Sequence, residues 1–116
     1  MIILCGHGKY GESIKSSLEM IAGKQENIFP VDFTEDMSVS DIISQYNKLI
    51  SLTSDNISIY CDIPGGSPAN AALLVKKYNP DVRVFTGLNL SMLLSLVTGE
   101  SSEKSLEEAK KSIKEW

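Results

Sequence analysis

Apolar and polar positions along the chain form blocks that predict strands and helices in alternation. A short apolar run bounded by turn residues is typical of a buried strand. A longer segment with apolar residues three and four positions apart is typical of a helix that packs one face on a core. The first pattern predicts strands over Ile2–Cys5, Ile28–Phe33, Ile57–Cys61 and Val82–Thr86.

The helical pattern predicts five helices, and capping residues indicate where some of them start. Ser38 with Asp41 resembles a capping pair. Ser67 is expected as an N-cap, because Pro68 after it suits the first helical position. The helices are expected over Tyr10–Ala22, Val39–Ile50, Pro68–Tyr78 and Leu90–Val97, with a last one that is opened by Ser105 and Glu108 and carries Leu106, Ala109 and Ile113.

Strands that alternate with helices predict an α/β fold: a three-layer, doubly wound, mostly parallel sheet with helices on both faces. The 116 residues are expected to form a single domain over residues 1–116, since domains commonly have about 50–200 residues. Pro30 predicts an edge position for its strand. Ligands bind at the carboxyl ends of the strands in such sheets, where residues 6–11, 62–68 and 87–89 form the loops.

Composition excludes several classes of protein. The formal net charge of −4 argues against nonspecific binding to nucleic acid, which needs clustered lysine and arginine. No apolar run approaches the ~20 residues that cross a bilayer, and the N-terminus does not resemble a signal peptide, so a cytoplasmic protein is expected. Cys5 and Cys61 are expected to be reduced and buried, and without a C-x-x-C spacing they are not expected to bind zinc with His7 and Asp62.

The only histidine, His7, lies in a glycine-flanked turn directly after the first predicted strand. An imidazole there is positioned to carry a proton or a phosphoryl group near neutral pH. Asp62 follows the third predicted strand, and these two strands are often neighbours in a doubly wound sheet. A carboxylate that accepts the imidazole N–H fixes the tautomer and directs the other nitrogen outward. The alternatives are a histidine that is merely packed or solvated and an aspartate that caps a turn.

The run Gly65-Gly66-Ser67-Pro68 is a candidate anion site. Two glycines allow backbone N–H groups to turn toward a phosphoryl group on His7, and Ser67 adds a hydroxyl at a helix N-terminus. The run lacks the GK[ST] of a nucleotide P-loop, and no GxGxxG follows a strand, so no nucleotide is expected. A tight turn followed by a helix cap is the alternative interpretation.

Together these residues resemble a known family. The runs IILCGHG (Ile2–Gly8), CDIPGGSPANAA (Cys61–Ala72) and TGLNLSMLL (Thr86–Leu94) are similar, in this order, to the enzyme IIA component of the mannose (mannose/fructose/sorbose) family of the phosphoenolpyruvate-dependent sugar phosphotransferase system. The resemblance implies that His7 is the phosphoacceptor, that Asp62 orients it and that Ser67 contacts the phosphoryl group, with backbone N–H groups near Gly8 and Gly66 assisting. It implies neither a metal nor a cofactor.

The resemblance also implies partners. Such proteins accept a phosphoryl group from the phosphocarrier protein HPr and pass it to enzyme IIB during sugar uptake, in indirect association with the membrane components IIC and IID. They are cytoplasmic homodimers that exchange an antiparallel edge strand. Two other functions fit the same residues: a phosphotransfer subunit of a dihydroxyacetone kinase complex, and a regulatory module whose phosphorylation controls another protein. The run Gly87–Leu90 favours sugar transport over the first, and the short chain, without a DNA-binding segment, disfavours the second.

Overall fold

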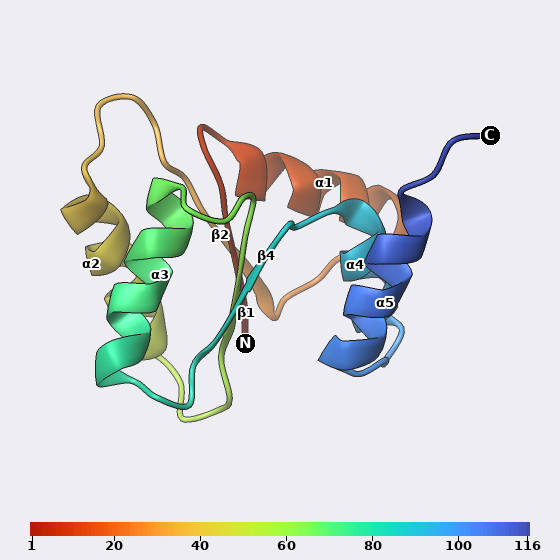
Figure 1. Cartoon of the computed structure of the whole chain (residues 1–116). Helices are drawn as coiled ribbons and strands as arrows, with labels where there is room; N and C mark the ends of the chain where they lie inside the picture. The colour runs from red at the N-terminus through yellow and green to blue at the C-terminus, as the bar shows by residue number, and fades with distance from the viewer.

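The computed structural model describes residues 1–116 and contains one parallel sheet between two layers of helices (Figure 1). The strand order is β2-β1-β3-β4, and every neighbouring pair is parallel. This architecture confirms the predicted doubly wound α/β fold. The strands are β1 (Ile2–Cys5), β2 (Ile28–Val31), β3 (Ser58–Cys61) and β4 (Arg83–Thr86).

The central strands β1 and β3 are almost wholly buried, which explains their continuous apolar sequences. They pair in a register that sets Cys5 opposite Cys61, so the loops that follow them leave the sheet side by side. Strand β2 lies at the edge, as Pro30 predicts. It ends at Val31 rather than at the predicted Phe33, because the chain leaves the parallel ladder there and Phe33 forms an antiparallel bridge with Gly8.

Three helices cover one face of the sheet: α1 (Tyr10–Ala22), α4 (Leu90–Val97) and α5 (Ser102–Ser112) (Figure 1). Their core includes Leu4, Leu18 and Leu93. The predicted start of the last helix is wrong, because Ser101 provides the N-cap by accepting a hydrogen bond from the Lys104 N–H. Ser105 is instead a buried residue inside the helix, and Ile113 lies beyond its end with 76% of its surface exposed.

Helices α2 (Val39–Ile50) and α3 (Ser67–Tyr78) cover the opposite face (Figure 1). Ser38 and Asp41 form the predicted capping box at the start of α2, a feature that commonly contributes about 0.5–2 kcal/mol. Tyr46 of α2 is fully buried, and its hydroxyl donates to the Pro68 carbonyl in the first turn of α3. This bond fixes the start of α3 beside the carboxyl end of β3. None of the helices combines the length and apolar character that a membrane span requires.

Candidate functional site

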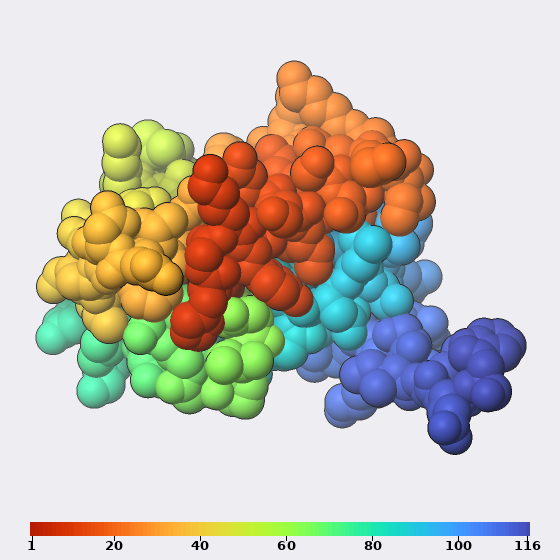
Figure 2. Space-filling model, turned by 90° about the horizontal axis from the view of Figure 1, so that it is seen from above, coloured from red at the N-terminus to blue at the C-terminus, as the bar shows by residue number.

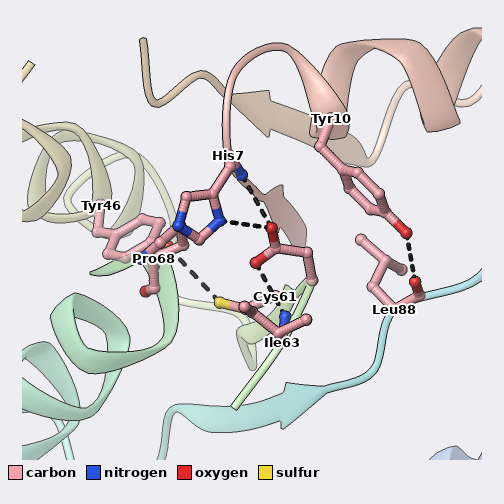
Figure 3. Close-up of polar contacts among 8 residues, drawn as sticks. His7, Tyr10, Tyr46, Cys61, Ile63, Pro68 and Leu88 are labelled. Atoms are coloured by element: carbon pink, nitrogen blue, oxygen red, sulfur yellow. Dashed lines mark hydrogen bonds and ion pairs between the residues drawn. The ribbon is translucent and has the colours of Figure 1, made fainter. Parts of the chain in front are cut away.

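His7 and Asp62 meet at the carboxyl ends of β1 and β3, as the sequence predicts (Figure 3). The Asp62 N–H donates to the Cys5 carbonyl at 3.2 Å, which extends the pairing of the two strands by one residue. His7 lies two residues beyond the end of β1 and turns back toward the carboxylate. Strand pairing between residues 55 positions apart in the sequence therefore creates the contact.

The Asp62 carboxylate uses both oxygens in hydrogen bonds. Its Oδ2 accepts from the backbone N–H of His7 at 2.9 Å and lies 2.7 Å from Nδ1 of the imidazole. Its Oδ1 accepts from the Ile63 N–H at 2.9 Å. Burial acts to raise the pKa of Asp62, but the hydrogen bonds from His7 and Ile63 outweigh it and hold that pKa below its usual range. The carboxylate is therefore ionised at neutral pH.

An ionised carboxylate only accepts hydrogen bonds, so Nδ1 of His7 must be the donor in this pair. In the neutral imidazole, the proton on Nδ1 leaves a lone pair on Nε2. The imidazole nitrogen that is not bonded to Asp62 points away from the carboxylate (Figure 3). The contact with Asp62 thus selects the tautomer whose unprotonated nitrogen is directed outward.

The His7 ring is held at its edges and remains open to solvent. Its side chain is 50% exposed, whereas that of Asp62 is 11% exposed. Phe33 packs against the ring edge-to-face with centroids 5.7 Å apart. A side chain at Gly66 would have its Cβ only 2.9 Å from Cε1 of His7, so the imidazole requires glycine there. Figure 2, which looks onto this end of the sheet, shows the N-terminal loop (red) at the surface between the segments that follow β2 (orange) and β3 (green).

The start of α3 differs by one residue from the sequence prediction. Gly66, not Ser67, is the N-cap: its backbone is extended, and its carbonyl accepts the Asn70 N–H at 2.9 Å. Ser67 is the first helical residue, and its side chain makes no capping bond. The backbone N–H groups of Ser67 and Ala69 have no acceptor within the chain. A helix N-terminus with free N–H groups beside His7 attracts an anion.

An assisting N–H group near Gly8 stays a prediction, and the N–H of Gly8 itself is already used within the chain. The Gly8 N–H already donates to the Phe33 carbonyl at 2.6 Å, and the Phe33 N–H donates back to Gly8 at 3.0 Å. Gly8 has a φ of +66°, the left-handed region that favours glycine. Its role is to turn the His7 loop toward Phe33, a contact that the sequence analysis missed because it placed Phe33 inside a strand.

The two cysteines lie under the site but take no part in it. Both are buried and free, and their side chains pack in the core beneath α2 and α3. Burial raises the pKa of Cys5 to about 11 and that of Cys61 to about 12, so both stay protonated thiols. No group of three or more His, Cys, Asp or Glu side chains is arranged to hold a metal ion.

A surface cavity lies away from this site. It has a volume of about 530 Å³ and is lined by residues of α4 and α5 and of the segments that follow them, among them Ser95 and Lys104. Its lining residues include neither His7 nor Asp62. The paired carboxylate and the adjacent helix N-terminus lie at His7, not at the cavity.

Comparison with known proteins agrees with this geometry. The family model of EIIA-man, described as PTS system fructose IIA component, matches residues 1–114. The PTS system sorbose-specific EIIA component of Klebsiella pneumoniae is 33% identical over 99 residues, which are 84% of this chain and 73% of that protein. The PTS system mannose-specific EIIAB component of Escherichia coli (strain K12) is 28% identical over 109 residues, and the chain spans only about a third of that protein's length, 34%.

A solved structure shows the same fold. The crystal structure of phosphotransferase system component EIIA from Streptococcus agalactiae superposes with a TM-score of 0.90 at 29% identity, covering 98% of this chain and 95% of that one. The matched residues 1–114 include the whole site around His7 and Asp62. The chain therefore belongs to the EIIA-man family, as an EIIA component of the mannose, sorbose and fructose type of phosphotransferase system.

Proposed function

We propose that the chain carries a phosphoryl group on Nε2 of His7, accepting it from the phosphocarrier protein HPr and passing it to an enzyme IIB component during sugar uptake. The observation that carries this proposal is the 2.7 Å contact between Nδ1 of His7 and the Asp62 carboxylate, in a ring that remains half exposed. An exposed nucleophile suits a reaction in which both donor and acceptor are proteins. Membership of the EIIA-man family supports the same role.

The chemistry is an in-line displacement at phosphorus. The Nε2 lone pair of His7 attacks the phosphoryl group on the HPr histidine. As the new P–N bond forms, the P–N bond to HPr breaks and its electron pair stays on the HPr imidazole. The proton stays on Nδ1 and remains hydrogen-bonded to Asp62. The negative charge of Asp62 offsets the positive charge that develops on the imidazole. Transfer to enzyme IIB repeats the step with a histidine of that partner as the nucleophile.

The N-terminus of α3 is the proposed phosphate-binding element. The free N–H of Ser67 and its hydroxyl, which has no capping role, are available to the phosphoryl oxygens, and Gly66 lets the helix start close to the imidazole. A helix N-terminus commonly contributes about 0.3–1 kcal/mol toward a nearby negative charge. We leave Gly8 out of this element because its N–H is already bonded to Phe33.

Phosphorylation in a reconstituted system tests the proposal. Wild-type protein incubated with phosphoenolpyruvate, enzyme I and HPr should acquire one acid-labile, base-stable phosphate. His7→Ala should acquire none while keeping the circular dichroism spectrum of the wild type. Phosphate that persists in His7→Ala, or wild type that takes up no phosphate from HPr, would refute the assignment.

We also propose that the protein acts in the cytoplasm as a homodimer, in indirect association with the membrane components IIC and IID. The open edge of the sheet supports the dimer: β4 has a neighbour on one side only, so alternate backbone N–H and C=O groups of Val84 and Thr86 face outward. All strands of this chain are parallel, so the antiparallel exchanged strand stays a prediction. Sedimentation equilibrium should give twice the chain mass, and a monomer would contradict the dimer.

A further inference from the structure

Tyr10 connects the loop that carries His7 to a loop on the far side of the site. It is the first residue of α1, and its hydroxyl donates to the Leu88 carbonyl at 2.7 Å. Leu88 follows β4 and lies 78 positions away in the sequence. The bond therefore joins two loops that meet only at the carboxyl end of the sheet (Figure 3).

The Leu88 loop is itself bonded to the end of β3, which completes a closed ring of contacts. The Leu88 N–H donates to the Cys61 carbonyl at 3.1 Å, and the Gly87 N–H donates to the Asp62 carbonyl at 3.2 Å. The Asp62 side chain then accepts from His7. Starting from His7, the path runs through Asp62 and Leu88 to Tyr10 and back along the loop. Without the Tyr10 hydroxyl this ring is open.

Gly6 leaves the space that the Tyr10 side chain occupies. A Cβ at position 6 would lie 2.7 Å from Cβ and 2.8 Å from Cγ of Tyr10, so the phenol occupies the space that a side chain there would need. Burial, and after it the nearby Asp62 carboxylate, raise the pKa of Tyr10, so the hydroxyl keeps its proton and remains a donor. The tyrosine is 37% exposed and lies outside the two buried clusters of the core.

We propose that Tyr10 is a positioning residue of the phosphoryl-transfer site: its hydroxyl holds the His7 loop against the loops that bear Asp62 and Leu88, and so keeps the carboxylate aligned on Nδ1 of His7. The inference rests on the proposed function of His7. Tyr10 is not a catalytic residue, because its hydroxyl is bonded to Leu88 and points away from the imidazole (Figure 3). Tyr10 acts through the tautomer of the His7 imidazole.

Breaking the closed path of hydrogen bonds at Tyr10 lets the His7 imidazole move relative to the Asp62 carboxylate. The tautomer protonated on Nε2 then gains population, and that tautomer has no lone pair at the attacking nitrogen. The net contribution of one neutral hydrogen bond corresponds to about a 3- to 10-fold change in an equilibrium. Tyr10→Phe should therefore lower the maximal rate of phosphorylation by about 3- to 10-fold. KM for phosphorylated HPr should not change, because the Tyr10 hydroxyl is already bonded to the Leu88 carbonyl and is not required for docking.

The test compares Tyr10→Phe with wild type and with Tyr78→Phe. Tyr78 is 87% exposed, and its hydroxyl makes no hydrogen bond, so it controls for the loss of a phenol. One measurement is the rate of phosphorylation by phosphorylated HPr as a function of its concentration. The other is the ¹⁵N spectrum of the His7 imidazole in protein that has met no phosphoryl donor. Tyr10→Phe should shift both ring nitrogens toward a mixture of tautomers, and Tyr78→Phe should match wild type in both measurements.

An unchanged imidazole spectrum in Tyr10→Phe, whatever its rate, would overturn the proposal, and so would a change confined to KM. Gly6→Ala reaches the same bond by displacing the Tyr10 ring and should change the spectrum in the same direction. Because the spectrum needs no phosphate, it reports on Tyr10 even if wild type fails to be phosphorylated. That failure would refute the proposed function and leave the coupling between Tyr10 and His7 as a separate result.

Discussion

A single oxygen of Asp62 binds His7 twice, once at the backbone N–H and once at Nδ1 of the ring, with distances of 2.9 and 2.7 Å. The first contact fixes the loop and the second fixes the side chain on it. Both depend on the negative charge of the carboxylate, which the hydrogen bonds stabilise despite burial. The orientation of the His7 imidazole and its tautomer are therefore set by one group.

Asp62→Asn should slow phosphorylation of His7 strongly. Loss of a charge-assisted hydrogen bond costs about 1.5–3 kcal/mol, which corresponds to about a 10- to 150-fold decrease in rate. The amide also leaves the developing positive charge on the ring without compensation. Single-turnover phosphorylation by phosphorylated HPr measures the effect, with circular dichroism as the control for folding. A rate equal to that of wild type would show that the carboxylate has no role in the transfer.

The free energy of unfolding should depend on pH in the acid range through the Asp62 carboxylate. The pKa of Asp62 is lowered in the folded protein, so below about pH 4 the unfolded chain takes up this proton first. The stabilisation is fully present above the unfolded pKa and is lost as pH falls through the lowered folded value. Urea unfolding of wild type and Asp62→Asn across the acid range should give free energies of unfolding whose difference shrinks toward low pH. A difference that stays constant would contradict the pKa shift.

Ser67 and Ser38 provide a matched pair for separating phosphate binding from helix capping. Ser67→Ala should leave the free energy of unfolding within about 0.5 kcal/mol of wild type, because the hydroxyl caps nothing, but should reduce the rate of phosphorylation. Ser38→Ala removes a true cap and should cost about 0.5–2 kcal/mol while the rate stays normal. Urea unfolding and single-turnover rates measure both. A lower free energy of unfolding with a normal phosphorylation rate in Ser67→Ala would show that Ser67 acts as a helix cap and not in phosphate binding.

Gly66→Ala should impair the site without unfolding the protein. The added Cβ would lie 2.9 Å from Cε1 of His7, so the ring must move away from the helix N-terminus or from Asp62. The phosphorylation rate should fall, whereas the melting temperature should change little because position 66 lies at the surface end of α3. A variant with normal rate would show that the imidazole tolerates the displacement.

The sequence allowed the order of the elements and the meeting of His7 with Asp62 to be predicted. Both follow from apolar periodicity and from the rule that parallel strands present their carboxyl ends at the same edge. The start of α5 was predicted too late, because the residues of its first turn are polar, so the apolar pattern of Leu106 and Ala109 does not reach it.

The finer details of the site depend on contacts between distant segments. Ser67 followed by Pro68 matches the local signature of an N-cap. In the structure the N-cap is Gly66, one residue earlier, and His7 packs against it. Phe33 comes to the imidazole through its bridge with Gly8, and that pairing has no local signal in either segment. Tyr10 gave no signal either, since the first residue of a helix is not expected to bond a loop 78 positions away.

The position of the phosphate on the imidazole tests the proposed role of His7 and Asp62 at the reacting atoms themselves. Protein labelled with ¹⁵N-histidine and phosphorylated through HPr has a single labelled ring, because His7 is the only histidine. We expect phosphorus coupling to Nε2, with Nδ1 still carrying its proton toward Asp62. Coupling to Nδ1, or a phosphate that shows no coupling to this ring, would contradict that role.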